Sequence, residues 1–198
     1  MEIKLVGLLL GAAVLPGLGQ SGPATVDVYM SGRDDSLELL RSGRPLASEI
    51  FRKIGIHLTW HTGELPAGQK AFGIRTVEQA PKSAGLEALA ASDLSNSAGV
   101  EITMYGDRLH LFLKAHSTPV GVAAAYVLAH ELGHAMQGVA RHSAIGIMKA
   151  HWSDSDFTEM VFHQLAFTPY DIELIHRGLA ERVAGKSLEP DESRPMRE

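Results

Sequence analysis

The chain contains no cysteine among its 198 residues. It therefore forms no disulfide, carries no lipid-modified N-terminal cysteine and cannot hold a metal ion through thiolates. Runs of basic residues are missing too, and the formal net charge is −5. Because proteins that bind nucleic acid through a basic surface cluster Lys and Arg on it, we expect no nucleic-acid partner. Stability must come from the hydrophobic core and from any bound metal ion.

A hydrophobic run near the N-terminus, residues 5–15, is too short to span a bilayer, which takes about 20 residues. Lys4 precedes the run, Pro16 breaks it, and the small residues of 17–19 offer a cleavage site. This pattern predicts a secretory signal peptide over residues 1–19 and a secreted or periplasmic protein. We expect no stable membrane insertion once the signal has been removed.

The most informative motif is His-Glu-x-x-His at residues 130–134, which lies in an uncharged stretch. Histidines four residues apart present both imidazoles on one face of an α-helix. Glu131 lies beside them, where it can act on a water molecule held by a metal without being a ligand. The pattern is typical of zinc-dependent peptidases. The alternative is an ordinary amphipathic helix with two exposed histidines and a glutamate.

Local signals predict the limits of the helix that carries this motif. Ser117 or Thr118 can cap its start, with Pro119 at the first helical position. Gly138 can adopt the left-handed conformation that ends a helix. The same glycine turn lets the chain bring His142 back toward the metal, as a third ligand. Three protein ligands and a water are the usual set at a catalytic zinc.

Residues 126–152 resemble the metzincin metallopeptidases. The metzincin pattern is an extended His-Glu-x-x-His motif, a glycine, a third histidine and a downstream turn that carries methionine. Here the spacing is HExxHxxxGxxxH, with the glycine one residue later and the histidine two residues later than is common. A group of bacterial predicted peptidases shares the His-Ser, Gly-Ile-Met and Trp run that follows, here 142–143, 146–148 and 152.

The resemblance implies a zinc metallopeptidase, acting as an endopeptidase on a peptide or protein substrate. His130, His134 and His142 would hold Zn²⁺, and Glu131 would be the general base for hydrolysis by a zinc-bound water. Met148 would pack beneath the histidines, as hydrophobic support rather than as a ligand.

Alternatives remain for both the ligands and the function. Glu159 lies where gluzincin peptidases place a glutamate ligand on a second helix, and Asp154 is another carboxylate that could serve. His151 could donate to a substrate carbonyl or could simply lie at the surface. The chain could also be a secreted zinc-binding or partner-binding module without activity, or a zinc hydrolase of non-peptide amides.

The length predicts one catalytic domain, residues 20–186, which we expect to be a monomer. The tail, residues 187–198, has high charge and two prolines and is predicted to be disordered. Periodicity alone gives an α+β fold in one domain. The resemblance implies a metzincin-like arrangement: a twisted, mostly parallel sheet with an antiparallel edge, an active-site helix, a methionine turn and a C-terminal helix.

The remaining elements follow from hydrophobic spacing and turn signals. We expect strands at 25–30, 56–60, 71–77, 99–105 and 109–114, with the last two joined as a hairpin through 106–108. We expect helical segments within 33–42, over 45–54, from Asp154 or Ser155 to Gln164, and from Thr168 to Ala184. Residues 81–97 are expected to form a surface excursion. The strand 99–105 is the candidate edge along which a peptide would bind.

Overall fold

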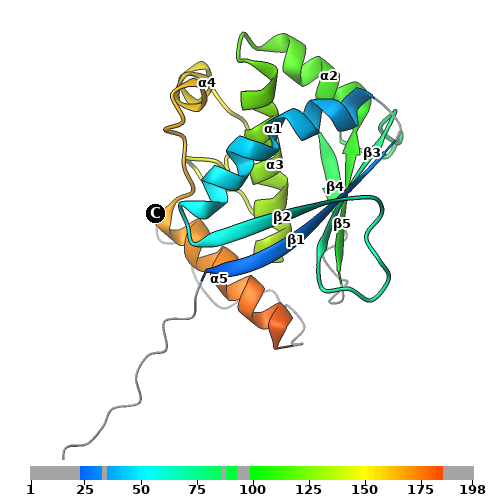
Figure 1. Cartoon of the computed structure of the whole chain (residues 1–198). Coiled ribbons are helices and arrows are strands. Elements are labelled where there is room, and N and C mark those ends of the chain that lie inside the picture. Colours follow the sequence, from blue (N-terminus) through cyan, green and yellow to red (C-terminus); the bar gives the residue numbers. More distant parts are fainter. Residues whose placement is uncertain (1–22, 33–34, 86–87, 93–98, 185–198) are drawn as a thin grey trace, which may run out of the picture.

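A five-stranded sheet forms the frame of the fold, in the order β2-β1-β3-β5-β4 (Figure 1). The structure, a computed structural model, describes residues 23–32, 35–85, 88–92 and 99–184. The strands are β1 (Ala24–Ser31), β2 (Ile56–Thr62), β3 (Phe72–Val77), β4 (Ala90–Ser92) and β5 (Val100–Tyr105). All neighbours run parallel except β4, which pairs antiparallel with β5. The predicted fold class, a mostly parallel sheet with an antiparallel edge, is confirmed.

The predicted signal peptide, residues 1–19, and the predicted tail, residues 187–198, lie outside the described residues. The limits of the predicted domain, 20–186, therefore stay a prediction.

One face of the sheet is covered by helices. In β1 the side chains of Val26, Val28 and Met30 are buried, whereas Asp27 and Tyr29 between them are only half-buried. This alternation is what a strand with one covered face requires, because successive side chains point to opposite sides. The helices are α1 (Asp35–Arg52), α2 (Gly106–Ala115), α3 (Val120–Gln137), α4 (Asp154–Val161) and α5 (Pro169–Val183).

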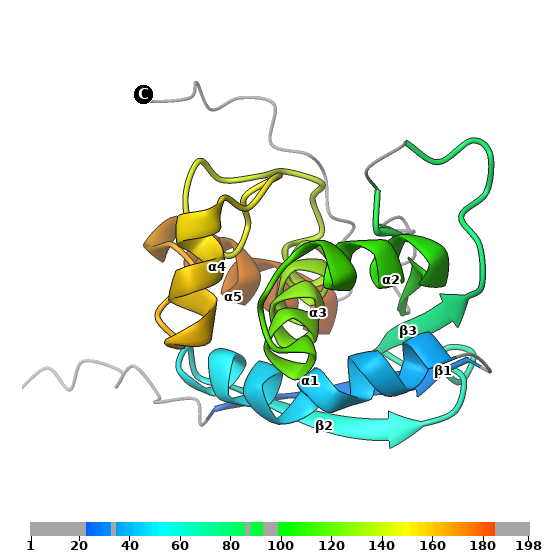
Figure 2. The same cartoon turned by 90° about the horizontal axis from the view of Figure 1, so that it is seen from above.

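Helix α3 occupies the middle of the molecule, and α1 lies across it on the same side of the sheet (Figures 1 and 2). A Cβ atom at Gly43 of α1 would lie only 2.5 Å from the backbone nitrogen of Ala125 in α3. The glycine therefore lets the two helix backbones approach closely. Most of α3 is buried, including the consecutive residues 123–130, which point to all sides of the helix, so its orientation is fixed by the core around it.

The helical predictions around the motif are confirmed. Helix α3 begins one residue after the predicted start and ends at Gly138, whose φ of 70° is left-handed. Helix α5 begins with Thr168 as its cap, and that side chain accepts a hydrogen bond from the backbone of Asp171. The cap of α4 is Ser153, one residue before the prediction, and α4 ends at Val161 rather than Gln164.

The strand predicted at 109–114 is wrong, because residues 106–115 form the helix α2. Leu109, Leu111 and Leu113 alternate and suggested a strand. The buried residues are instead Leu109 and Leu113, four apart, while Leu111 is 66% exposed. That spacing is one face of a helix. Asp107 suits the first turn, where the helix dipole favours an acid.

The predicted edge strand is wrong as well. Strand β5, predicted over 99–105, is paired on both sides. The edge strand on that side of the sheet is the short β4, which lies inside the expected surface excursion.

Helix α1 also differs from the prediction of two segments, since it continues through Pro45. A proline inside a helix removes one backbone hydrogen bond, and here the packing of α1 against α3 outweighs that loss.

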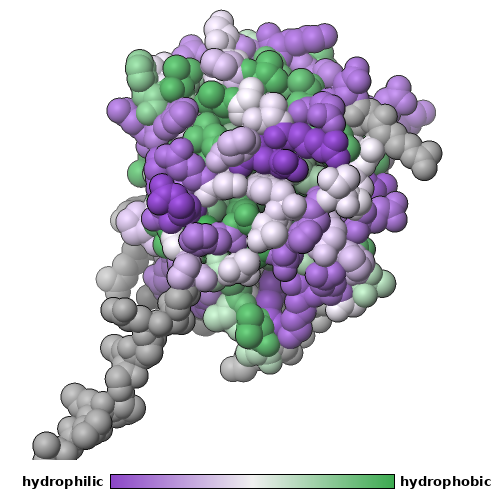
Figure 3. Space-filling model, in the orientation of Figure 1, coloured by the Kyte–Doolittle hydropathy of each residue, from purple (hydrophilic) through white to green (hydrophobic). Residues whose placement is uncertain are grey.

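The face of the molecule in Figure 3 mixes hydrophilic and hydrophobic residues rather than presenting one apolar surface. Helix α1 contributes charged groups to the surface, such as the ion pair of Glu38 and Arg41. Among the described residues, no helix combines the length and the apolar character needed to cross a membrane.

Candidate metal centre

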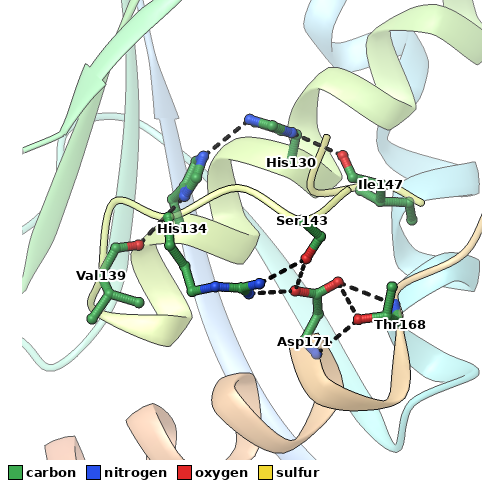
Figure 4. A network of polar contacts seen from close by, with 8 residues as sticks. His130, His134, Val139, Ser143, Ile147, Thr168 and Asp171 are labelled. Atoms are coloured by element: carbon green, nitrogen blue, oxygen red, sulfur yellow. Dashed lines mark hydrogen bonds and ion pairs between the residues drawn. The ribbon is translucent and has the colours of Figure 1, made fainter. Parts of the chain in front are cut away.

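Three histidines converge at the C-terminal end of α3. His130 and His134 point from the helix toward each other, with their Nε2 atoms 3.0 Å apart (Figure 4). His142 comes from the segment that follows Gly138. Each of the three offers a ring nitrogen, and these atoms all lie within 4.8 Å of one another. Across the described ranges, no other three His, Asp or Glu residues gather in this way.

Backbone carbonyls orient two of the rings. The Nδ1 atom of His130 lies 2.9 Å from the carbonyl oxygen of Ile147, and that of His134 lies 3.4 Å from the oxygen of Val139. A carbonyl only accepts, so each Nδ1 carries the hydrogen and each Nε2 presents a lone pair. Lone pairs that face each other at 3.0 Å repel, and a cation beside both of them would relieve that repulsion. Carbonyl support of this kind is usual behind histidine ligands.

The charge state of these rings also suits a cation. Burial lowers the pKa of His130 to about 4 and that of His134 to about 3. Burial also lowers the pKa of His142, and His151 and Arg141 act in the same direction. The rings of His130 and His134 are therefore neutral at pH 7, which is the form that binds metals.

The donor set fits zinc. Imidazole nitrogens suit zinc among other transition metals. Tetrahedral zinc with bonds of 2.0–2.1 Å separates its ligand nitrogens by about 3.3 Å, close to the 3.0 Å between His130 and His134. Three protein ligands leave a fourth position for water or substrate, as catalytic zinc requires.

Glu131 is half-buried and lines the same cleft as the histidines. Burial raises the pKa of its carboxyl from the ordinary 4.5 to about 7. An acid–base catalyst works best when its pKa lies near the working pH. The site thus combines a neutral imidazole triad with a carboxyl group suited to exchange protons near neutral pH.

Met148 packs directly under the motif. Its side chain is fully buried, and its Sδ would lie 2.6 Å from a Cβ atom at Gly133. Glycine at that position of the motif therefore makes room for the methionine between the two histidine turns. The result is an apolar support beneath the convergent rings.

Backbone hydrogen bonds close the turn that brings Met148 there and join it to the chain at Ala166. Ser143 donates its N–H to the carbonyl of Met148 at 2.8 Å, and Ile147 donates to Ala166 at 3.0 Å. Gly146 has a φ of 79°, and a Cβ atom there would clash with the carbonyl oxygen of Ala166. The turn consequently requires glycine at 146.

The histidines lie in a cleft of about 580 Å³. Residues 88–92, which contain the edge strand β4, form part of its wall, and Ala140 and 149–152 form another part. Phe112 and Trp152 add aromatic surface, and the ring of Trp152 meets that of His130 edge-on at 5.5 Å. The size suits a short stretch of peptide or a small ligand.

The structure brings together every residue predicted at the centre: His130, Glu131, His134 and His142. The rival ligands Glu159 and Asp154 are exposed on α4 and line no part of the cleft. His151 is exposed and lines the cleft, so the structure agrees with both predicted roles: a donor to a substrate carbonyl and an ordinary surface histidine.

Sequence reasoning missed other parts of the cleft wall, chiefly Phe112, His116 and strand β4. Helical spacing of Leu109, Phe112 and Leu113 could have found the first two. The three residues of β4 have no pattern of their own.

Comparison with models of known protein families finds no match, and comparison with curated proteins finds none. Among solved structures, the chain is similar to archaemetzincin from Methanopyrus kandleri, a crystal structure at 1.5 Å resolution. The similarity covers 82% of this chain and 99% of that chain, with 17% sequence identity and a TM-score of 0.46. At that level it supports no inference about activity, which must come from the residues of this chain.

Proposed function

We propose that the protein is a secreted zinc-dependent peptidase, in which His130, His134 and His142 hold Zn²⁺ and Glu131 is the general base. The observation that carries the proposal is the convergence of three neutral imidazoles in a cleft that Glu131 also lines. A structural zinc site would have four protein ligands and no need for a base. Three ligands beside a carboxyl group of raised pKa favour catalysis.

Zinc bound at this centre supplies a Lewis acid that activates water and polarises a carbonyl group. Glu131 accepts a proton from the attacking water and delivers it to the leaving amine as the C–N bond breaks. Its pKa of about 7 suits both steps, because the carboxyl can take and return a proton near neutral pH. The carbonyls of Ile147 and Val139 keep the Nε2 atoms of the two helix histidines turned toward the metal position.

The packing beneath the centre supports the resemblance to metzincins. We assign Met148 the place of the metzincin methionine, because it is buried against Gly133 between the two histidine turns. Gly138 ends the helix in the left-handed conformation and directs the chain toward His142, as the extended motif requires.

An extended peptide is the substrate that the cleft favours. Strand β4 pairs with β5 on one side, and no described strand pairs with its other side. The residues of β4 also line the cleft. An edge strand can bind an extended chain through backbone hydrogen bonds, and would hold its scissile bond beside the histidines. The proposal therefore includes a peptide or protein as the substrate and endopeptidase action on it.

Secretion is proposed from the sequence of residues 1–19, which lie outside the described part of the chain. Purification of the protein from a culture of its natural host, followed by N-terminal sequencing, tests it. A mature N-terminus near residue 20, found outside the cytoplasm, is expected. A protein recovered from the cytoplasm with residues 1–19 intact would contradict it.

Hydrolysis of casein and of a quenched peptide library tests the activity. The purified protein should cleave peptides, and a zinc chelator should abolish cleavage. Glu131→Ala should lower kcat/KM by about 10²- to 10⁴-fold, the usual contribution of a general base, while the protein still binds one zinc ion. Glu159→Ala is the matched control, because this exposed glutamate lies outside the cleft.

Three outcomes would contradict the proposal in different ways. Undiminished activity of Glu131→Ala would show that Glu131 is not the general base. Cleavage of small amides without cleavage of peptides would indicate an amide hydrolase. Stoichiometric zinc with no hydrolysis of either class would indicate a binding module.

A further inference from the structure

The third histidine lacks the support that the other two have. The rings of His130 and His134 are each held by a backbone carbonyl. His142 is exposed, and its ring lies against those of His130 and His134, with centroids 5.4 and 4.9 Å away. In the described part of the chain, no hydrogen bond reaches that ring. His142 lies between α3 and α4, in a stretch with no helix or strand. Apart from these ring contacts, its position depends on the backbone on either side of it.

Both neighbours of His142 are tied to one buried carboxylate, that of Asp171 in the first turn of α5. Figure 4 labels Asp171 and one of these neighbours, Ser143. The Nη1 atom of Arg141 donates to Oδ1 of Asp171 at 2.8 Å, and the hydroxyl of Ser143 donates to the same oxygen at 2.7 Å. Arg141 also donates from Nη2 to the Ser143 hydroxyl at 3.0 Å, which closes a triangle around the residue between them. Its guanidinium lies over the ring of Tyr170, 5.0 Å from the centroid.

The other oxygen of Asp171 is fixed to its own helix. Oδ2 accepts from the backbone N–H of Thr168 at 3.1 Å and from its hydroxyl at 2.6 Å. Asp171 is 0% exposed. Burial raises the pKa of its carboxyl, but hydrogen bonds from Thr168, Ser143 and Arg141 outweigh that and lower the pKa below its ordinary value. The carboxylate is thus ionised, immobile and able to hold the segment of His142.

We propose that Asp171 is a positioning residue for the metal centre, which clamps Arg141 and Ser143 to the start of α5 and so sets the place of His142. The proposal rests on the metal centre proposed above. It adds that the affinity for zinc depends on a carboxylate that is not itself a ligand. Groups that orient metal ligands typically contribute 10- to 100-fold to metal affinity.

Zinc affinity, measured by chelator competition on the full chain, tests the proposal. Asp171→Asn should weaken zinc binding by about 10- to 100-fold. Glu173→Gln is the matched control, because it also replaces a carboxylate with an amide in the first turns of α5, but this exposed side chain has no hydrogen bond to Arg141 or Ser143 among the described residues. It should change the affinity by less than about threefold. If Asp171→Asn fails to fold, Ser143→Ala replaces it as the test. That variant removes only one hydroxyl and should also weaken zinc binding.

A double-mutant cycle with His142→Ala separates positioning from a general effect. If Asp171 acts through His142, Asp171→Asn should have no further effect on zinc affinity once His142 is alanine. A loss of the same size in both backgrounds would overturn the proposal, because loss of nearby negative charge or of fold stability would persist without His142. Unchanged affinity in Asp171→Asn would overturn it too. A parent protein that binds no zinc would instead refute the proposed metal centre itself.

Discussion

Replacing Glu131 with glutamine should stabilise the metal-free protein at high pH and leave it unchanged at low pH. Burial raises the pKa of this carboxyl from 4.5 to about 7, so the folded state disfavours its charged form. The stability associated with the neutral carboxyl is therefore fully present below pH 4.5. It is lost as the pH rises through 7, where the folded protein must ionise a buried group. Glutamine has the same shape and never ionises.

The size of the effect follows from the interval between the two pKa values. From 4.5 to about 7, at roughly 1.4 kcal/mol for each pKa unit, the upper limit is about 3 kcal/mol. Because the side chain is partly exposed in the cleft, we expect a difference of about 1–2 kcal/mol at pH 8.

Urea unfolding of both metal-free proteins at pH 4.5 and pH 8 measures this difference. Both proteins contain the same histidines and differ only at residue 131, so the comparison reports on that carboxyl group. Glu159→Gln is the control, because that side chain is exposed on α4 and should show no such difference. Equal stabilities of the parent and Glu131→Gln at both pH values would refute the claim that burial raises this pKa.

Two further predictions concern the turn and the ligands. Gly146→Ala should destabilise the protein by about 1–3 kcal/mol more than Gly55→Ala in thermal unfolding. Both glycines have φ near 78°, but only the Cβ at 146 would clash, so equal losses would contradict the role of that turn. Zinc affinity, measured in Glu131→Gln, should fall by only a few-fold from pH 8 to pH 6 and by much more at pH 4, because the pKa of each of the three histidines is lowered below its ordinary 6.5. The pKa values of about 4 and about 3 leave His130 and His134 neutral in that range, and a large loss by pH 6 would contradict them.

The sequence predicts most accurately where the signal is local. The ends of α3, the cap of α5 and the return of His142 follow from Pro119, Gly138, Thr168 and the histidine spacing, and the structure has all of them within a residue. Each depends on a few neighbouring residues whose conformation is restricted by their own chemistry.

The errors arise where long-range packing decides. Leu109, Leu111 and Leu113 alternate like a strand, but the core buries the first and third on one helical face. The Ala-Ala-Ser of β4 has no pattern and becomes a strand because it pairs with β5. The link from Asp171 to Arg141 spans 30 residues, so no local pattern in the sequence predicts it.

A crystal structure of the zinc-loaded protein, with anomalous diffraction recorded at the zinc edge, tests the central claim most directly. We predict one zinc peak at about 2.0–2.1 Å from a ring nitrogen of each of His130, His134 and His142, with no fourth protein ligand. A zinc ion held elsewhere, or one bound by the helix pair while His142 points away, would contradict it.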